Sequence, residues 1–332
     1  MKTLACGVAV ALLAGCGGSQ PPIGAPGAMS QTSAIATHAE RGKSWMLPEA
    51  KSRNLLKSKS PSLNGNVGSN DVRLQQASKR ALLYASLDTS IGIYTYPDGK
   101  AVGTIQTTYG PESVCNGNSG DIWVATSFRY AYEFKRGNEH PIETADTGTD
   151  APITSCAVSQ TDGKLALAAY SVGIFIFEKD RGSAKLDVPP FTPDSCAYDD
   201  HGNLFIDGIK SFGIAELPRG SKQFINIRLD RRGGTPAGGL LWDGKYMAVA
   251  TAIRSQKLIY RFNVGGSSGT VAQVIHFKRQ VKSTHFAIYE NRIIGQGPGA
   301  NFAGLWPYPE GGQLQSRLDI IGARSFAISA PP

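Results

Sequence analysis

The chain has 332 residues, of which 41% are hydrophobic and 18% are charged, and it carries a formal net charge of +8. This is the composition of an ordinary globular protein with enough apolar material for a core. Residues 17–80 hold nine basic and three acidic residues, whereas residues 81–332 hold 24 and 23. The excess charge therefore lies outside the segment expected to fold. That segment shows no basic patch with interleaved aromatic residues, so we exclude nucleic acid as a partner.

The first sixteen residues read as a processing signal. Lys2 supplies a positive charge, residues 4–13 are a short apolar run, and Leu13-Ala14-Gly15 precedes Cys16. The run is too short to span a bilayer. The pattern resembles a bacterial lipoprotein signal, which implies removal of residues 1–15, lipidation of Cys16 and, because Gly17 replaces Asp, an outer-membrane location in a Gram-negative cell envelope. An ordinary secretory signal with an incidental cysteine is the alternative.

Residues 16–80 are expected to hold the lipidated cysteine and a flexible basic linker. Small and polar residues dominate this stretch and it shows little periodicity, which favours disorder. A basic tether beside a membrane is attracted to anionic headgroups. A merely soluble linker fits the same composition.

Look-alike segments recur about every 40 residues through the rest of the chain. The steps between them are 41, 40, 43, 47 and 40 residues. The residues that anchor this spacing are Cys115, Cys156, Cys196, Gly239, Phe286 and Phe326. A period of this size built from short strands is typical of propeller blades. In the third repeat we expect strands at 156–159, 164–170, 173–178 and 185–188, with a turn at Asp162-Gly163.

The two chain ends predict how the ring closes. Residues 81–109 match strands two, three and four of the repeat, and residues 325–329 match strand one. Five full repeats and one repeat shared by the ends make six blades. We therefore expect residues 81–332 to form an all-β, six-bladed β-propeller in which N- and C-terminal strands pair and no sheet edge is left open at the junction.

The repeat resembles the six-bladed propellers of the NHL and SMP-30/TolB-like groups. Residues 194–206, which read DSCAYDDHGNLFI, are the closest copy of that pattern. Residues 44–51, 83–86 and 94–100 resemble a set of bacterial lipoproteins to which no activity is assigned. In those proteins the first segment runs almost directly into the first strand, so residues 52–80 look like an insertion.

Three cysteines lie within the repeats, and the packing of inner strands is their expected role. Phe286 and Phe326 fill the corresponding place later in the chain. Equivalent positions on neighbouring blades are expected to lie too far apart for the roughly 4.4–6.8 Å Cα spacing of a disulfide. We therefore expect Cys115, Cys156 and Cys196 to be buried thiols; one disulfide or a three-cysteine metal site are the alternatives.

Propellers of this type usually bind ligands at one mouth of the central channel. That mouth is formed by residues just before strand one and by the loop between strands two and three. The candidate ligand-binding residues at these places are Glu112, Ser113, Thr154, Asp194, Thr284, His285, Arg324, Arg129, Lys210 and Arg254. Such a mixed ring suits a small polar or anionic ligand or a peptide end. A water-filled channel lined by satisfied polar groups is the alternative.

The expected function is a non-catalytic binding or interaction module, monomeric and without a cofactor, held at the cell envelope by its lipid. The resemblance to SMP-30-like lactonases implies the alternative, a metal-dependent hydrolase with calcium or zinc in the channel. Its ligands would be a Glu, an Asn and an Asp, for which Glu112, Asn301 and Asp194 are the candidates. Hard divalent cations prefer several convergent oxygens, and the aligned positions offer few.

Overall fold

The computed structural model describes residues 79–178, 184–187, 189–208, 213–230, 235–253, 256–278 and 285–331. The chain divides into two units, Met1–Ser44 and Trp45–Pro332, and every described residue belongs to the second. The predicted signal, Cys16 and the linker up to residue 78 lie outside the described residues. Among the described residues no helix has the length and apolar character needed to cross a membrane.

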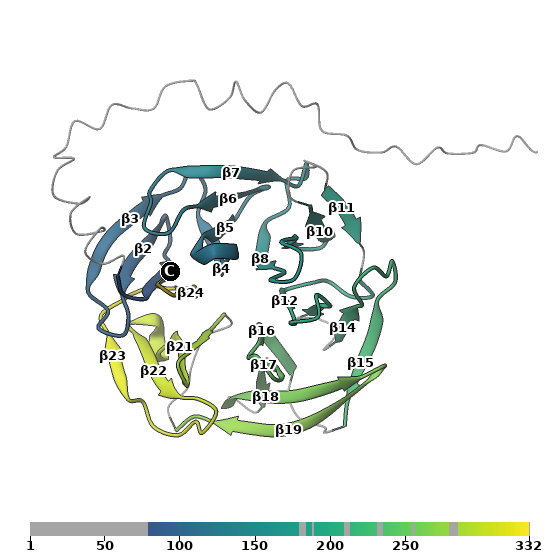
Figure 1. The fold of residues 1–332 in the computed structure, drawn as a ribbon. Helices are drawn as coiled ribbons and strands as arrows, with labels where there is room; N and C mark the ends of the chain where they lie inside the picture. Colours follow the sequence, from purple (N-terminus) through teal and green to yellow (C-terminus); the bar gives the residue numbers. More distant parts are fainter. Residues whose placement is uncertain are drawn as a thin grey trace, which may run out of the picture. The chain divides into compact units, whose positions relative to one another are not determined.

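Short antiparallel strands build almost the entire described region, and they are arranged around a central axis (Figure 1). The first sheet runs in the order β24 (Ser325–Ser329), β1 (Leu82–Ser86), β2 (Ser90–Thr95) and β3 (Ala101–Gln106). The next runs β4 (Pro111–Asn116), β5 (Ile122–Thr126), β6 (Tyr130–Phe134) and β7 (Pro141–Asp146). The third comprises β8 (Ile153–Val158), β9 (Leu165–Ala169), β10 (Gly173–Phe177) and β11 (Ala184–Asp187). The last comprises β20 (Ala287–Tyr289), β21 (Arg292–Gln296), β22 (Ala303–Pro307) and β23 (Ser316–Leu318).

One sheet contains eight strands and differs from the predicted four-stranded pattern. It joins β12 (Ser195–Tyr198), β13 (Leu204–Asp207), β14 (Ile214–Leu217) and β15 (Ile225–Leu229) to β19 (Ser268–His276), β18 (Gln256–Gly265), β17 (Met247–Ile253) and β16 (Thr235–Trp242). The junction is a parallel pairing of β15 with β19 at Arg228–Ser268 and Leu229–Gly269. The hairpin of β18 and β19 is long enough to extend past its own sheet and reach β15 (Figure 1).

The strand positions of the third repeat lie close to those expected from its turn residues. Gly163 has a φ of +72°, a conformation that glycine adopts without steric cost, and its N–H donates to the carbonyl of Ser159 at 2.8 Å. Asp162 and Gly163 therefore turn the chain between β8 and β9 as their sequence predicts.

The core lies between neighbouring sheets. Every residue of β1 is buried, because side chains alternate between its two faces and both faces are covered. Leu83 and Ala85 pack against residues of β21 and β22, whereas Leu82 and Tyr84 pack against residues of β4 and β5. Both faces of an inner strand must therefore be apolar, which is why these strands read as continuous hydrophobic runs.

The chain ends meet in the first sheet as predicted. β24 pairs antiparallel with β1, with Ala85 opposite Phe326 and Tyr84 opposite Ala327. Arg136 reinforces this pairing from the next sheet: its guanidinium donates to the carbonyls of Ala330 at 2.9 Å and Ser329 at 3.3 Å. Arg136 also donates to the carbonyl of Arg80, so one side chain ties both ends of the ring to the second sheet.

Candidate functional site

A cavity of about 260 Å³ lies on the axis, lined by the inner strands β4, β8, β12, β16, β20 and β24. Ser113 and His285, two of the predicted ligand-binding residues, are in its lining. Burial lowers the pKa of His285 to about 4, so its imidazole is neutral at pH 7. A cationic imidazole is therefore absent from the channel wall at this position.

Serine hydroxyls beside the cavity hold the inner strands to one another. The Oγ of Ser325 accepts the N–H of Val114 at 3.2 Å, and the Oγ of Ser195 accepts the N–H of Leu240 at 3.0 Å. Ser155 does the same for the N–H of Cys196 at 3.3 Å. All three serines are buried. The hydroxyls beside the channel thus accept hydrogen bonds from backbone donors of the neighbouring inner strand.

Cys115 and Cys156 form a disulfide, which corrects the expectation of buried thiols. Their sulfurs are 2.13 Å apart and their Cα atoms 5.8 Å apart. The repeat spacing placed both cysteines at one repeat position, but in the structure Val114, not Cys115, is the equivalent of Cys156. Val114 lies opposite Val124 and Cys156 lies opposite Leu167, and Val124 and Leu167 occupy the same place in β5 and β9. A one-residue offset turns a strand side chain to the other face, so the two cysteines point toward each other across the gap between sheets. Cys196 is a free, buried thiol as expected, and burial raises its pKa to about 12.

Glu112 and Arg324 come together at the mouth, but as partners of each other. Arg324 Nη1 donates to Glu112 Oε1 at 3.0 Å, and Arg324 Nη2 donates to Asp88 Oδ1 at 2.9 Å. The predicted carboxylate and guanidinium are therefore neutralised within a surface ion cluster. Its contribution to stability is small, because Arg324 and Asp88 are well exposed to water.

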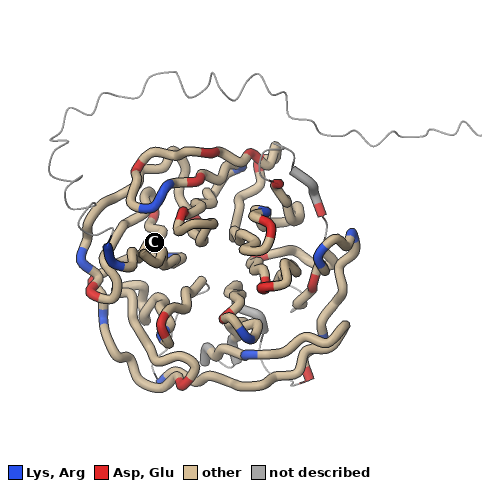
Figure 2. The backbone as a smooth tube through the Cα atoms, viewed as in Figure 1, with Lys and Arg blue, Asp and Glu red and all other residues tan. Residues whose placement is uncertain are grey.

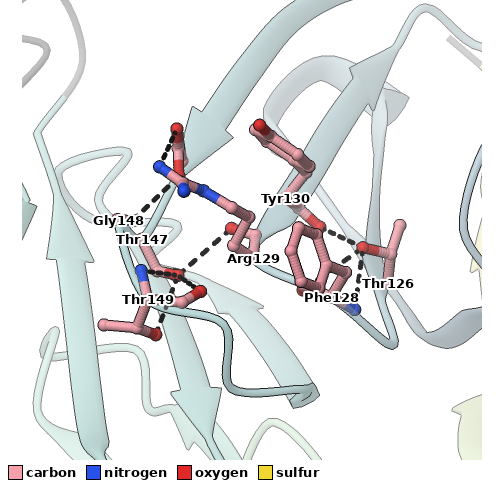
Figure 3. Close-up of polar contacts among 8 residues, drawn as sticks. Thr126, Phe128, Arg129, Tyr130, Thr147, Gly148 and Thr149 are labelled. Carbon is pink, nitrogen blue, oxygen red and sulfur yellow. Dashed lines mark hydrogen bonds and ion pairs between the residues drawn. The ribbon is translucent and has the colours of Figure 1, made fainter.

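Arg129 lies in the loop between β5 and β6 and is bound to the end of β7 (Figure 3). Its Nε and Nη2 donate to the two carboxylate oxygens of Asp146 at 2.6 and 2.7 Å. Asp146 holds the pKa of Arg129 above its ordinary value. The backbone carbonyl of Arg129 accepts both the N–H and the hydroxyl of Thr147, at 3.0 and 3.2 Å. This bidentate pair has a fixed geometry and lies at the mouth end of the second sheet.

Four aromatic side chains gather next to this pair; we call them the aromatic cluster. They are Tyr109, Phe128, Tyr130 and Tyr132, with ring centroids 4.8 to 6.2 Å apart between successive contacts. Each is partly exposed, and the guanidinium of Arg129 lies 5.4 Å from the ring centre of Tyr130. This cluster was not among the residues predicted from the sequence. Its signal was the alternation of Phe128, Tyr130 and Tyr132, which places three aromatic rings on one face.

Asp194 is paired in space with a carboxyl group that the sequence analysis did not select, Asp207. Asp194 precedes β12 and Asp207 ends β13; their backbones hydrogen bond at 2.9 Å. Burial raises the pKa of Asp194 to about 6. Burial, followed by the nearby charge of Asp194, raises the pKa of Asp207 well above its ordinary value. Asp207 Oδ1 accepts the N–H of Ser195 at 2.9 Å, while its Oδ2 is buried and has no hydrogen-bond partner in the part of the chain that the structure describes.

The remaining predicted residues do not complete a common site. The hydroxyl of Thr154 donates to the carbonyl of Ala168 at 3.2 Å. Thr284, Lys210 and Arg254 lie outside the described residues. The charged candidates among the described residues therefore fall into separate groups: an ion cluster, an arginine–aspartate pair and a buried carboxyl pair. Ser113 and His285 line the axial cavity apart from these groups.

The metal ligands implied by the lactonase resemblance do not fit a metal site in the described structure. Glu112 pairs with Arg324, and Asp194 belongs to no group of three convergent His, Cys, Asp or Glu ligand atoms among the described residues. Asn301 is an exposed residue between β21 and β22. The group that has suitable spacing there is Asp199, Asp200 and His201, on the turn at the opposite end of β12. Asp199 already accepts hydrogen bonds from the backbone of His201 and Asn203, which explains that cluster as turn structure.

Comparison with known proteins identifies the fold but no relative by sequence. No family model matches the chain, and no curated protein matches it either. A solved structure of a nidogen/laminin complex matches with a TM-score of 0.62 at 10% identity, covering 76% of this chain and 99% of that one. A protein of unknown function from Bacteroides caccae matches with a TM-score of 0.56 at 12% identity, covering 75% and 99%. A functionally unknown protein from Desulfotomaculum acetoxidans DSM 771 matches with a TM-score of 0.52 at 8% identity, covering 76% and 99%.

These neighbours and the strand arrangement define the class: the chain has an all-β, propeller-like fold. At identities this low the likeness extends to the fold alone.

Proposed function

We propose that the fold is a six-bladed propeller of the NHL and SMP-30/TolB-like type. The eight-stranded sheet consists of two four-stranded halves that share two residue pairs along β15 and β19. Phe205 and Ile214 of one half pack against Met247 and Val249 of the other in one buried cluster. The halves thus pack face to face as neighbouring blades do. Six such clusters occur among the described residues, which supports six blades around the axis.

We further propose that the protein is a non-catalytic binding or interaction module that engages a protein or a small polar ligand at the mouth. The aromatic cluster beside Arg129 and Asp146 is the observation that carries this function. Tyrosine, phenylalanine and arginine are enriched at binding surfaces, where they contribute area and directed hydrogen bonds at low entropic cost. Ile321, 70% exposed in the loop before β24, adds an apolar side chain at the same end of the strands.

The proposed location is the cell envelope, with a lipid on Cys16 and the basic linker between lipid and propeller. The disulfide supports this location, because such bonds persist in oxidising compartments and are rare in the cytosol. We expect Cys16→Ala to release the protein from the membrane fraction. If the variant fractionates as the parent does, the lipid anchor is wrong.

Site-specific photo-crosslinking in cells tests the binding surface. A benzophenone amino acid replaces Phe128 in the aromatic cluster or, as the control, Ile142 on the outer strand β7 of the same sheet, which is 49% exposed. We expect a discrete crosslinked adduct from position 128 and none from position 142. Equal yields at both positions, or none at 128, would contradict a binding surface at the mouth.

The metal-dependent hydrolase is distinguished by a thermal-shift series with divalent cations. Calcium or zinc that raises the melting temperature at stoichiometric concentration would favour the hydrolase over the binding module. An unchanged melting temperature across the series leaves the binding module as the better account.

A further inference from the structure

A second cavity, of about 360 Å³, lies between the sheet of β8–β11 and the strands β12–β15. It is lined by the turns at Asp162, Gly202 and Gly220, which join strands at the end opposite to the mouth. Ile176 and Leu204, with Leu217, supply an apolar floor. The volume lies within the range of roughly 300–1,000 Å³ that small-molecule sites occupy. We call this cavity the Tyr198 groove, after the residue described below.

Cationic side chains form the rim of the Tyr198 groove. Lys164, Arg219 and Lys222 line it together with the carboxylates of Asp162 and Glu178. Figure 2 shows basic residues on the loop between β14 and β15 that forms one side. The three cations outnumber the two carboxylates, so the rim carries a net positive charge and favours an anion.

The ion pairs inside the rim are loose. Lys164 Nζ is 3.4 Å from Asp162 Oδ2 and 3.6 Å from Glu178 Oε1, and Arg219 Nε is 3.7 Å from Asp162 Oδ2. Tight charge-assisted hydrogen bonds measure about 2.7–2.9 Å. Lys222 makes no ion pair within the described part of the chain. Its ammonium group, and to a lesser degree the other two cations, can therefore turn toward a bound anion at little cost.

Tyr198 supplies an unused hydrogen-bond donor at the groove. Tyr198 is one of the residues that line the cavity, and its hydroxyl oxygen is buried without a hydrogen-bond partner among the described residues. Burial raises the pKa of Tyr198, and the charge of Asp162 raises it further, so the hydroxyl keeps its proton. A buried donor without an acceptor is unfavourable, and an acceptor oxygen on a ligand would satisfy it.

We propose that the Tyr198 groove binds a small amphiphile, an apolar chain that ends in one carboxylate. The chain covers Ile176, Leu204 and Leu217. The carboxylate faces Lys222 and Arg219 and accepts the hydrogen bond of the Tyr198 hydroxyl. This site lies at the other end of the strands from the mouth, so it is separate from the binding surface proposed above.

Isothermal titration of the purified full chain with octanoate tests the proposal, with octylammonium as the probe of opposite charge. We expect octanoate to bind with one site per chain and octylammonium to bind at least about tenfold more weakly. Lys222→Ala and Tyr198→Phe are each expected to weaken octanoate binding about fivefold, the loss of one exposed charge contact or one hydrogen bond. Lys278→Ala, an exposed lysine outside the groove, is the matched control and should bind as the parent does.

Melting temperatures of the variants distinguish a loss of octanoate binding from a loss of folding stability. Because the Tyr198 hydroxyl has no hydrogen-bond partner within the described ranges, Tyr198→Phe should melt no lower than the parent. The proposal would be overturned by an absence of octanoate binding, by octanoate affinities of Tyr198→Phe and Lys222→Ala that match the parent, or by an octylammonium affinity equal to that of octanoate. None of these results bears on crosslinking at Phe128, so the proposal for the mouth and the proposal for the Tyr198 groove are tested independently.

Discussion

Asp194 and Asp207 show how one buried position affects the stability of the whole protein. Each carboxyl group has a raised pKa in the folded state, Asp194 to about 6. A carboxyl group with a raised pKa binds its proton more tightly when folded than when unfolded. Its stabilising effect is therefore complete below the unfolded pKa and is lost as the pH rises through the folded value. For Asp194 the shift of about two pKa units corresponds to about 3 kcal/mol lost between about pH 4 and pH 7.

Replacing this carboxyl group with a neutral isostere should remove that loss. We expect Asp194→Asn to melt close to the parent at pH 4 and clearly above it at pH 8, because the amide carries no charge into the buried position. Calorimetric melting temperatures at pH 4 to 8 measure the difference. Asp319→Asn, whose side chain is 94% exposed, is the control and should follow the parent. Parallel pH profiles for Asp194→Asn and the parent would show that Asp194 does not titrate in this range.

At the scale of the strand, the disulfide depends on which face of β4 a side chain occupies. Val114 belongs to the buried cluster shared with β1 and β2, whereas Cys115 packs in the cluster that contains Cys156 and Leu167. Consecutive residues of β4 therefore face different sheets: Val114 contacts the sheet of β1, and Cys115 bonds to the sheet of β8. The bond closes a loop between positions 41 residues apart and cross-links two neighbouring sheets beside the axis.

Loss of this cross-link should destabilise the protein measurably. Because the unfolded chain gains freedom when a loop of this length opens, Cys115→Ser with Cys156→Ser should lower the free energy of unfolding by about 4 kcal/mol. Urea denaturation measures the change. A thiol reductant should shift the parent toward the double variant and leave the double variant unaffected. If the reductant has no effect on the parent, or the two proteins unfold alike, the bond does not form in solution.

Local signals explain why the strands were predictable while their cross-links were not. Asp162 and Gly163 mark the turn between β8 and β9, and the apolar run of β9 predicts burial on both faces; both signals lie within a few residues. By contrast, the hydrogen bond from Leu240 to Ser195 and the disulfide of Cys115 depend on the register between inner strands of different repeats. Ser195 and Leu240 are separated by three intervening strands along the chain, and the disulfide depends on a one-residue offset. No local pattern encodes either alignment.

The same distinction applies to the candidate site. The repeat positions selected Glu112 and Arg324 as separate candidates, and no feature of the sequence indicated that they would pair with each other. The repeat positions also passed over Asp207, because the residue ends an apolar strand where Ser86 or Thr126 stands in other repeats. The chemistry of the mouth thus arises from contacts between repeats, whereas the sequence pattern describes each repeat alone.

For the whole molecule, the pairing of β24 with β1 is the contact on which the arrangement of the sheets and of the mouth depends. This strand fixes the position of Arg324 and Ser325 at the mouth and covers the edge of β1, which would otherwise offer free backbone groups. Tyr84 contributes as well: its hydroxyl accepts the N–H of Gly137 at 2.7 Å, close to where Arg136 binds the chain ends. We therefore expect the last strand of the chain to unfold together with the core rather than to fray from it.

Native-state hydrogen exchange of the strand amides tests this closure most directly. We predict that the amides of residues 325–329 open with a free energy within about 1 kcal/mol of those of residues 82–86, because the two strands share one ladder and unfold together. Opening free energies near zero for residues 325–329, the behaviour of a frayed terminus, with strong protection retained at 82–86, would contradict the closed ring.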